Sequence, residues 1–263
     1  MKVIYPDKIT AIAASASDAE YPALYLSDEH IKRPWKSTGN TGTLTISVDG
    51  GTGIRAIGMF ETNAIQAVIT IRNATDTADI IPAVTYDTGA TSWYSFITGG
   101  GDYFKNIWHE YSATIYAACE SAHKIKIALT ASAGVQVYCG VIRSGQSREF
   151  RNPQYGLSEG LKDFSVIKEL NNGARYTRKR DIPRTFSGKF MVDRDPDFYQ
   201  FMHDVAQTAG PIPLAWLLYD DGATTTSDTE NRWAVFAYFD SMPSGSHAYY
   251  QHSEIDFALT EAI

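Results

Sequence analysis

The chain has 263 residues, of which 44% are hydrophobic and 13% aromatic, and its formal net charge is −7 at pH 7. This length and hydrophobic content are sufficient for two domains with separate cores. The acidic balance argues against nucleic acid as the main partner, because neutralising phosphates requires a positive surface.

Alternation of apolar and polar residues runs through the first half of the chain. Leu44, Ile46 and Val48 share one face of a predicted strand that ends at a Gly-rich turn. The same pattern continues over 54–61, 67–72, 93–97, 107–118, 125–129 and 135–141. Short alternating strands separated by Gly, Asn and Asp turns predict an antiparallel β-sandwich over 1–145, similar to a jelly roll.

A polar segment rich in Gly and Asn, residues 141–186, joins the two halves. Its spaced hydrophobic residues distinguish it from a flexible Gly/Ser or Pro tether, so we expect an ordered joint between two domains. Within it, Asn171-Asn172-Gly173 predicts a hairpin turn.

The second half, 146–263, is predicted to be a small β-barrel or sandwich with one packed helix over 195–209. Asp195 is suited to be the N-cap, Pro196 to be the first helical residue, and Gly210 to end the helix. Phe198, Phe201, Met202 and Val205 form one apolar stripe. Strands are expected over 184–192, 213–219, 232–239 and 252–260.

The compartment is indicated by the cysteines and by the apolar runs. Cys119 and Cys139 both lie in hydrophobic runs and are too few for a disulfide framework, so we expect free thiols in a reducing cytoplasm. The first twenty residues lack the apolar core of a secretory leader. No apolar run approaches the roughly 18 residues that a membrane-spanning helix needs, so we expect no membrane partner.

Motifs for catalysis and metal binding are weak. The segment 156–160 matches the nucleophile pattern G-x-S-x-G around Ser158, but no buried strand is predicted before it, so a loop is expected. The six histidines include no HExxH pair, and His247 and His252 lack further ligands nearby in the sequence. We therefore expect no enzyme activity, no catalytic residue, no metal and no cofactor.

Five cations crowd one short stretch: Arg175, Arg178, Lys179, Arg180 and Arg184. They repel one another unless anions lie close by. Three interpretations stay open: a solvated hairpin face, phosphate binding, and contact with an acidic neighbour such as the stretch 220–230 of another copy. Contact between copies is preferred, and nucleic acid ranks last.

Trp35 lies between Arg33 and Lys36 in an early loop of the predicted sandwich. A tryptophan there can stack on a sugar or a partner, or it can plug one end of the sandwich, and both interpretations stay open. Arg33, Trp35 and Trp93 form the candidate set for contact with a glycan or a partner.

The sequence resembles tail proteins of long-tailed bacteriophages. ALYLSDEHIKRPWKSTG, followed by TLTISVDGGTGIRAIGMFETNA, is similar to discoidin-like jelly-roll modules found in such proteins. The joint, from GVIRSGQ through 152–164, looks like the segment that leads into a tail-type domain. Arg184-Thr185-Phe186-Ser187-Gly188, followed by a helix and strands, resembles the tail-tube-like fold of tail tubes and distal tail rings.

This resemblance implies a structural protein of the virion, assembled in the cytoplasm of the host bacterium. Its partners would be copies of itself in a ring, a hexamer by family analogy, and other tail proteins between the tube and the tip. The family has no catalytic residues. The alternative function is a carbohydrate-binding module that recognises a host surface glycan through the first domain.

Overall fold

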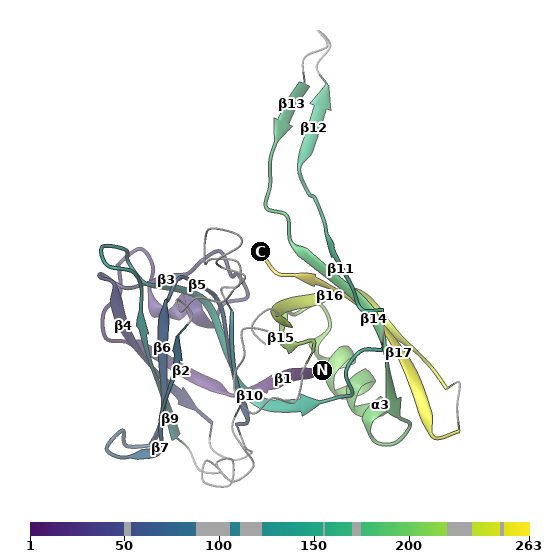
Figure 1. Cartoon of the computed structure of the whole chain (residues 1–263), viewed down its shortest axis with the longest axis horizontal. Helices are drawn as coiled ribbons and strands as arrows, with labels where there is room; N and C mark the ends of the chain where they lie inside the picture. Colours follow the sequence, from purple (N-terminus) through teal and green to yellow (C-terminus); the bar gives the residue numbers. More distant parts are fainter. Residues whose placement is uncertain are drawn as a thin grey trace. The chain divides into compact units, whose positions relative to one another are not determined.

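The computed structural model of the chain describes residues 1–49, 54–87, 106–110, 123–154, 156–169, 175–219, 233–247 and 250–263. The chain divides into two compact units (Figure 1). Unit 1 comprises Met1–Glu149 and Leu214–Val235, and unit 2 comprises Phe150–Pro213 and Phe236–Ile263. Antiparallel strands dominate both units, which confirms the mainly β prediction. No helix within the described ranges is long and apolar enough to cross a bilayer.

This division differs from the single predicted boundary at 145/146. The segment Leu214–Val235 belongs to unit 1, because strand β15 (Leu214–Leu217) pairs with the N-terminal strand β1 (Lys2–Asp7). A short apolar strand has the same sequence pattern whichever sheet it joins. The pattern therefore identified the strand at 213–219 but assigned it to the domain nearer in sequence.

Unit 1 is an antiparallel sandwich of two sheets, as predicted. The first sheet has the order β15-β1-β10-β5-β8, and β3 also pairs with β10. Its further strands are β3 (Trp35–Lys36), β5 (Ala56–Thr62), β8 (Ile107–Glu110) and β10 (Tyr138–Glu149). The second sheet has the order β2-β4-β9-β6-β7. Its strands are β2 (Ile9–Ala14), β4 (Thr41–Val48), β6 (Gln66–Asn73), β7 (Asp79–Asp87) and β9 (His123–Thr130).

The alternation that predicted β4 determines which of its side chains enter the core. Leu44, Ile46 and Val48 are buried, whereas Thr45 and Ser47 between them are partly exposed. Leu44 pairs with Ile127 of β9, so both residues lie on the inner face of the second sheet. The same core includes Ile142 of β10 from the first sheet.

The other strand predictions for the first half have mixed outcomes. The ranges 54–61, 67–72 and 125–129 are confirmed as β5, β6 and β9, and the range 135–141 overlaps the start of β10. The range 93–97 lies outside the described residues, as does 107–118 beyond the end of β8. The sequence did not predict β1, β2 or β7, nor the short 3₁₀ helix η1 (Ala23–Ser27).

The described strands of unit 2 form a four-stranded sheet in the order β11-β14-β17-β16. They are β11 (Ser158–Leu161), β14 (Arg184–Asp193), β16 (Ala234–Ser246, whose first two residues belong to unit 1) and β17 (His252–Glu261). Phenylalanines fill the core, where the ring centroids of Phe190 and Phe201 are 4.9 Å apart. Phe150 packs edge-on against Phe201 at 5.2 Å.

One helix packs on this sheet, as predicted. It consists of α3 (Asp197–Tyr199) and the π-helical η2 (Gln200–Gln207). Phe198, Phe201 and Val205 of the predicted stripe are buried. Gly210 ends the helix with a positive φ of 56°, and its N–H donates to the carbonyl of Ala206 at 3.0 Å.

The prediction that Asp195 is the N-cap is wrong. Pro196 is the cap residue, and no side-chain capping bond is formed. The carbonyl of Pro196 accepts the N–H of Gln200 at 3.0 Å. The first helical hydrogen bond therefore starts one residue later than the sequence pattern suggested.

A two-stranded hairpin extends from this sheet in Figure 1. Strand β12 (Val166–Glu169) pairs with β13 (Arg175–Arg178), in the register Val166↔Arg178 to Glu169↔Arg175. The predicted turn at Asn171-Asn172-Gly173 lies outside the described residues, but the flanking strands pair as that turn required. We refer to residues 163–181 as the arm.

Strands β1 and β10 approach each other so closely that one position admits only glycine. Gly145 of β10 pairs with Asp7 of β1 and with Ala56 of β5. A Cβ atom at this position would overlap the carbonyl oxygen of Pro6. Since this obstacle is backbone, no change of rotamer can relieve the overlap.

We expect Gly145→Ala to destabilise unit 1 by roughly 1–3 kcal/mol, as overpacking in a close-packed interior does. Gly39→Ala is the matched control, because nothing lies within 4 Å of a Cβ atom at that position. Urea unfolding followed by tryptophan fluorescence measures the change, because all five tryptophans belong to the chain segments of unit 1. Equal midpoints for the two variants would contradict this account of Gly145.

Candidate functional site

The arm continues the main sheet of unit 2 as a ribbon with an interruption at its base. Leu161 of β11 pairs with Arg184 of β14, and the N–H of Lys162 donates to the carbonyl of Pro183 at 3.1 Å. Pro183 has no N–H with which to continue the ladder. Farther out, the N–H of Arg180 donates to the Ser165 hydroxyl at 3.1 Å, before the regular pairing of β12 and β13 begins. The arm is therefore joined to the sheet by a few polar contacts.

Both faces of the arm are exposed to solvent. Successive strand residues point to opposite faces, so Ile167 and Thr177 lie on one face, and Lys168 and Tyr176 on the other. Ile167 is 63% exposed and Tyr176 is 56% exposed. Each face thus presents one large hydrophobic side chain beside polar ones.

The arm is positively charged on an acidic protein. It contains five cations and three carboxylates, a net charge of +2, whereas the whole chain carries −7. Arg175 pairs with Glu169 across the hairpin at 3.3 Å, where both side chains are exposed. The hydroxyl and N–H of Ser165, together with nearby Lys179, lower the pKa of the Asp163 carboxyl. Arg178, Lys179 and Arg180 have no carboxylate within ion-pair distance among the described residues.

Arg184 does not belong to this exposed group, and its role in contact between copies stays a prediction. Its guanidinium holds the carboxylate of Glu261 with two hydrogen bonds, Nη2–Oε1 at 2.9 Å and Nε–Oε2 at 3.2 Å. The register of β14 and β17 brings the two residues side by side, and only 18% of the Arg184 side chain is exposed. The stretch 220–230, the candidate acidic counterpart, lies outside the described residues.

Trp35 is a core residue, so its predicted role in contacting a glycan or a partner is wrong. Its side chain is fully buried, and the ring Nε1–H donates to the Ser17 hydroxyl at 2.9 Å. Gly42 lies so close to the ring that a Cβ atom there would be 2.6 Å from it. The alternative interpretation, a plug within the sandwich, is confirmed. Arg33 is exposed, 3.9 Å from Asp28, and Trp93 lies outside the described residues.

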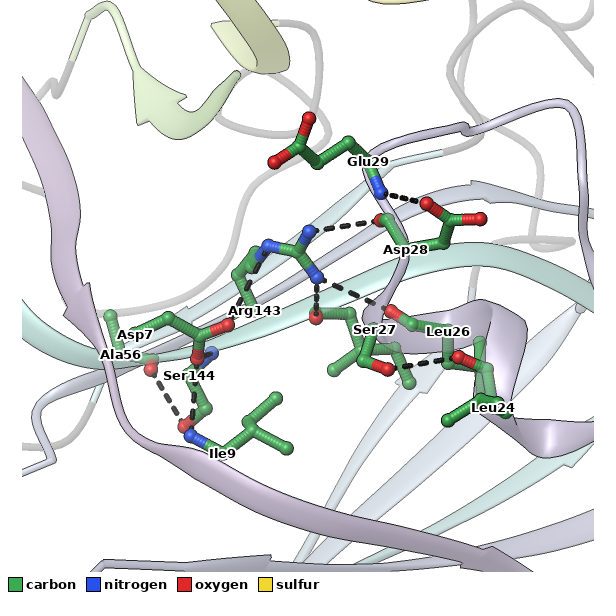
Figure 2. Close-up of polar contacts among 11 residues, drawn as sticks. Asp7, Ile9, Leu24, Leu26, Ser27, Asp28, Glu29, Ala56, Arg143 and Ser144 are labelled. Carbon is green, nitrogen blue, oxygen red and sulfur yellow. Dashed lines mark hydrogen bonds and ion pairs between the residues drawn. The ribbon is translucent and has the colours of Figure 1, made fainter. Parts of the chain in front are cut away.

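A buried cation in unit 1, which was not predicted from the sequence, is shown in Figure 2. Arg143 of β10 donates from Nη2 to the carbonyl of Asp28 at 2.9 Å and from Nη1 to those of Ile142 at 3.0 Å and Leu26 at 3.4 Å. Its Nε lies 3.6 Å from the carboxylate of Asp7. The sequence signal was present, because an arginine interrupts the apolar alternation of GVIRSG. This cluster ties η1, β1 and β10 together.

Burial determines the electrostatics of this cluster. It raises the pKa of the Asp7 carboxyl, although Arg143 and the N–H groups of Ser144 and Ile9 oppose the shift. Burial also lowers the pKa of Arg143, against the attraction of Asp7, Glu29 and Asp28. The desolvation of each ion thus exceeds the stabilisation that its partners provide.

The weak catalytic motif does not have the geometry that its chemistry requires. Ser158 is the exposed first residue of β11 and pairs with Ser187, rather than lying on a sharp turn between a strand and a helix. His247 contacts the Ser253 hydroxyl at 2.7 Å, and His252 contacts Asp193 at 3.0 Å. Within the described ranges, no three His, Cys, Asp or Glu side chains group as a metal site would require.

Burial favours the neutral forms of two other side chains in unit 1, Cys139 and His109. Burial raises the pKa of the Cys139 thiol to about 12, so it stays protonated and unreactive. Burial also lowers the pKa of His109 to about 4, and its Nδ1 shares a hydrogen bond with the Tyr86 hydroxyl. Cys139 is a free thiol, and Cys119 lies outside the described residues.

Comparison with known proteins gives structural likenesses only. No family model matches the chain, and no curated protein matches it in sequence. A crystal structure of reduced XRCC1 bound to the DNA polymerase β catalytic domain is similar at a TM-score of 0.40 and 13% identity, over 53% of this chain and 97% of that one.

Carbohydrate-binding modules are also among the similar structures. Chitosan-binding module 1 of a Paenibacillus chitosanase/glucanase has a TM-score of 0.38 at 12% identity, over 53% of this chain and 96% of the module. A pectin-binding module has the same score and identity, over 53% of this chain and 92% of its own length. Likenesses at this level carry no argument about function.

The Asp7 carboxyl gives a prediction about pH. Because its pKa is raised above 3.8 in the folded chain, its contribution to stability is fully present below that pH and is lost as pH rises through the folded-state pKa. Asparagine has no such titration. We therefore expect the unfolding free energy of Asp7→Asn, relative to the natural chain, to increase as pH rises through this window.

Urea titrations read by tryptophan fluorescence at several pH values measure this difference. Gly39→Ala, which alters no ionisable group, should keep the pH profile of the natural chain. A difference for Asp7→Asn that stays constant or decreases with pH would contradict the assignment.

Proposed function

We propose that the protein is a structural building block that assembles with further copies of itself through the arm of unit 2. The observation that carries this proposal is a two-stranded hairpin with both faces exposed. Such a hairpin is marginally stable alone in water and gains stability when a third strand or a partner surface covers one face. Ile167 and Tyr176, one on each face, are the side chains that such contact would bury.

Charge supports another copy as the partner. The arm carries +2 within a chain of −7, so the remainder carries −9. The positive arm is therefore attracted to the negatively charged remainder of a neighbouring copy. Carboxylates of that copy would neutralise the exposed cations of the arm. Arms that each dock onto the next copy form a closed ring when the rotation between copies closes.

The more specific proposal rests on the sequence resemblance. The protein would be a distal-tail-like component of a bacteriophage tail tip or baseplate, assembled in the bacterial cytoplasm and carried in the virion. Its ring, a hexamer by family analogy, would join the tail tube to tip proteins. Its mechanism would be assembly, with neither enzymatic turnover nor a cofactor.

Light scattering after size exclusion, with negative-stain images, tests assembly. We expect the full chain to form a particle of several copies that dissociates as salt is raised, because exposed charge pairs are screened. Ile167→Asp changes one face of the arm and Tyr176→Asp the other. The substitution on the face that contacts the neighbouring copy should weaken assembly on the order of 10- to 100-fold.

Leu24→Asp is the control, since Leu24 is 75% exposed and lies in unit 1. It should assemble as the natural chain does. A natural chain that stays monomeric at every concentration, or assembly that neither arm variant changes, would exclude the arm as the contact.

A second candidate function is glycan binding by unit 1, and it is favoured by a groove on the outer face of the second sheet. The groove has a volume of about 330 Å³ and is lined by Val68, Thr70, Arg72, Asp79, Lys126 and Ala128. Arg72 is held by Asp76 at 2.6 Å and by Asp79 at 2.8 Å. Hydroxyl, cationic and anionic groups side by side can hydrogen-bond sugar hydroxyls.

We expect a glycan array probed with the full chain to give a signal that Lys126→Glu reduces roughly tenfold, the cost of a lost charged hydrogen bond. Lys8→Glu is a control for charge alone, because Lys8 lies in unit 1 and does not line the groove. No signal above background, or equal signals for both variants, would count against this groove.

A further inference from the structure

A second polar pocket lies in unit 2, where β14 ends and β17 begins. Its volume is about 550 Å³, and it is lined by Arg151, Asp193, Arg194, Asp195, Tyr250, Gln251 and His252. Asp193 and His252 are paired across the two strands, and the N–H of Arg194 donates to the carbonyl of Gln251 at 2.9 Å. The pocket is thus built on the end of a regular ladder, which holds its walls in place.

A network of three side chains forms the fixed part of this pocket. Oδ1 of Asp193 accepts from Arg151 Nη2 at 3.0 Å and contacts His252 Nδ1 at 3.0 Å. Among the described residues, the second oxygen of Asp193 has no hydrogen-bond partner. Arg151 and His252 therefore orient the Asp193 carboxylate through Oδ1, and its second oxygen can accept a hydrogen bond from a ligand.

Other polar side chains around this network make no hydrogen bond within the described residues. Within the described structure, the side chains of Arg194, Asp195 and Gln251 make no hydrogen bond or ion pair. Tyr250 exposes 88% of its surface to solvent. The pocket therefore offers donors, acceptors and an aromatic ring, all accessible to a ligand.

The charge of the pocket narrows the class of ligand. Two arginines and two aspartates give a formal sum of zero with His252 neutral, so neither a strong anion nor a strong cation is favoured. Sugar hydroxyls both donate and accept, and the apolar face of a sugar ring packs on an exposed aromatic ring. The volume lies within the range usual for small-molecule sites.

We propose that this pocket of unit 2 binds a neutral saccharide, with the sugar ring against Tyr250 and its hydroxyls on Asp193, Asp195 and Arg194. The proposal is independent of the arm and of the groove in unit 1, because all seven lining residues belong to unit 2. Sugar binding would then be a property of unit 2, which contains the domain predicted from the sequence to build the ring.

The test uses the full chain and tetrasaccharides of glucose, galactose, mannose and N-acetylglucosamine, with a sialylated and a uronic acid oligosaccharide for comparison. Saturation-transfer NMR detects binding, and titration calorimetry measures it. Tyr250→Ala is expected to weaken binding of a neutral probe by roughly tenfold, the loss of one aromatic contact.

Tyr199→Ala is the matched control, since Tyr199 is also an exposed tyrosine of unit 2 but does not line the pocket. It should bind as the natural chain does. Asp195→Asn is a second pocket variant, expected to weaken binding without disturbing the Asp193 network.

Three results would overturn the proposal. The first is no binding of any neutral probe at millimolar concentration. The second is binding restricted to the two acidic saccharides. The third is binding that persists unchanged in both Tyr250→Ala and Asp195→Asn.

Discussion

The burial of one charge constrains the architecture of unit 1. Arg143 lies in the middle of its first sheet, where an unpaired guanidinium would be very costly. The carbonyls of Leu26 in η1 and of Asp28 just after it accept from that guanidinium, and the end of β1 brings Asp7 beside it (Figure 2). Three segments far apart in the sequence are therefore fixed by a single side chain. Such a polar cluster contributes little net stability, but it disfavours alternative arrangements of these loops.

Unit 2 combines a rigid part with an extension. The phenylalanine core holds the helix on the four-stranded sheet, while the arm leaves the sheet at Pro183 with few contacts of its own. If assembly and sugar binding both hold, they reinforce each other. Several copies in one particle present several pockets, so weak individual affinities combine into strong attachment to a surface that displays many sugars.

The sequence predicted most of the strands and the helix whose apolar residues recur at a regular spacing. Alternation identified the inner strands of the sandwich, and the stripe from Phe198 to Val205 identified the helix. Strands with little alternation were missed, and among them β11 is exposed along most of its length. An exposed strand leaves no hydrophobic pattern to read.

The candidate residues were harder to predict because their roles depend on tertiary partners. Trp35 has the same flanking cations whether it is buried or exposed, and only its packing against Gly42 decides the matter. Arg184 follows the cations of the arm closely in sequence, yet Glu261 from the last strand holds it. The pocket at Tyr250 joins three distant segments, which no local motif could reveal.

The strand order also affects how the chain folds during synthesis. In unit 1, β1 pairs with β15, more than two hundred residues later, and in unit 2 the central strand β17 pairs with both β14 and β16. Neither sheet can therefore be completed while these late strands are still inside the ribosome. The nascent chain must keep apolar strand edges exposed for most of its synthesis, a period in which chaperone binding competes with aggregation.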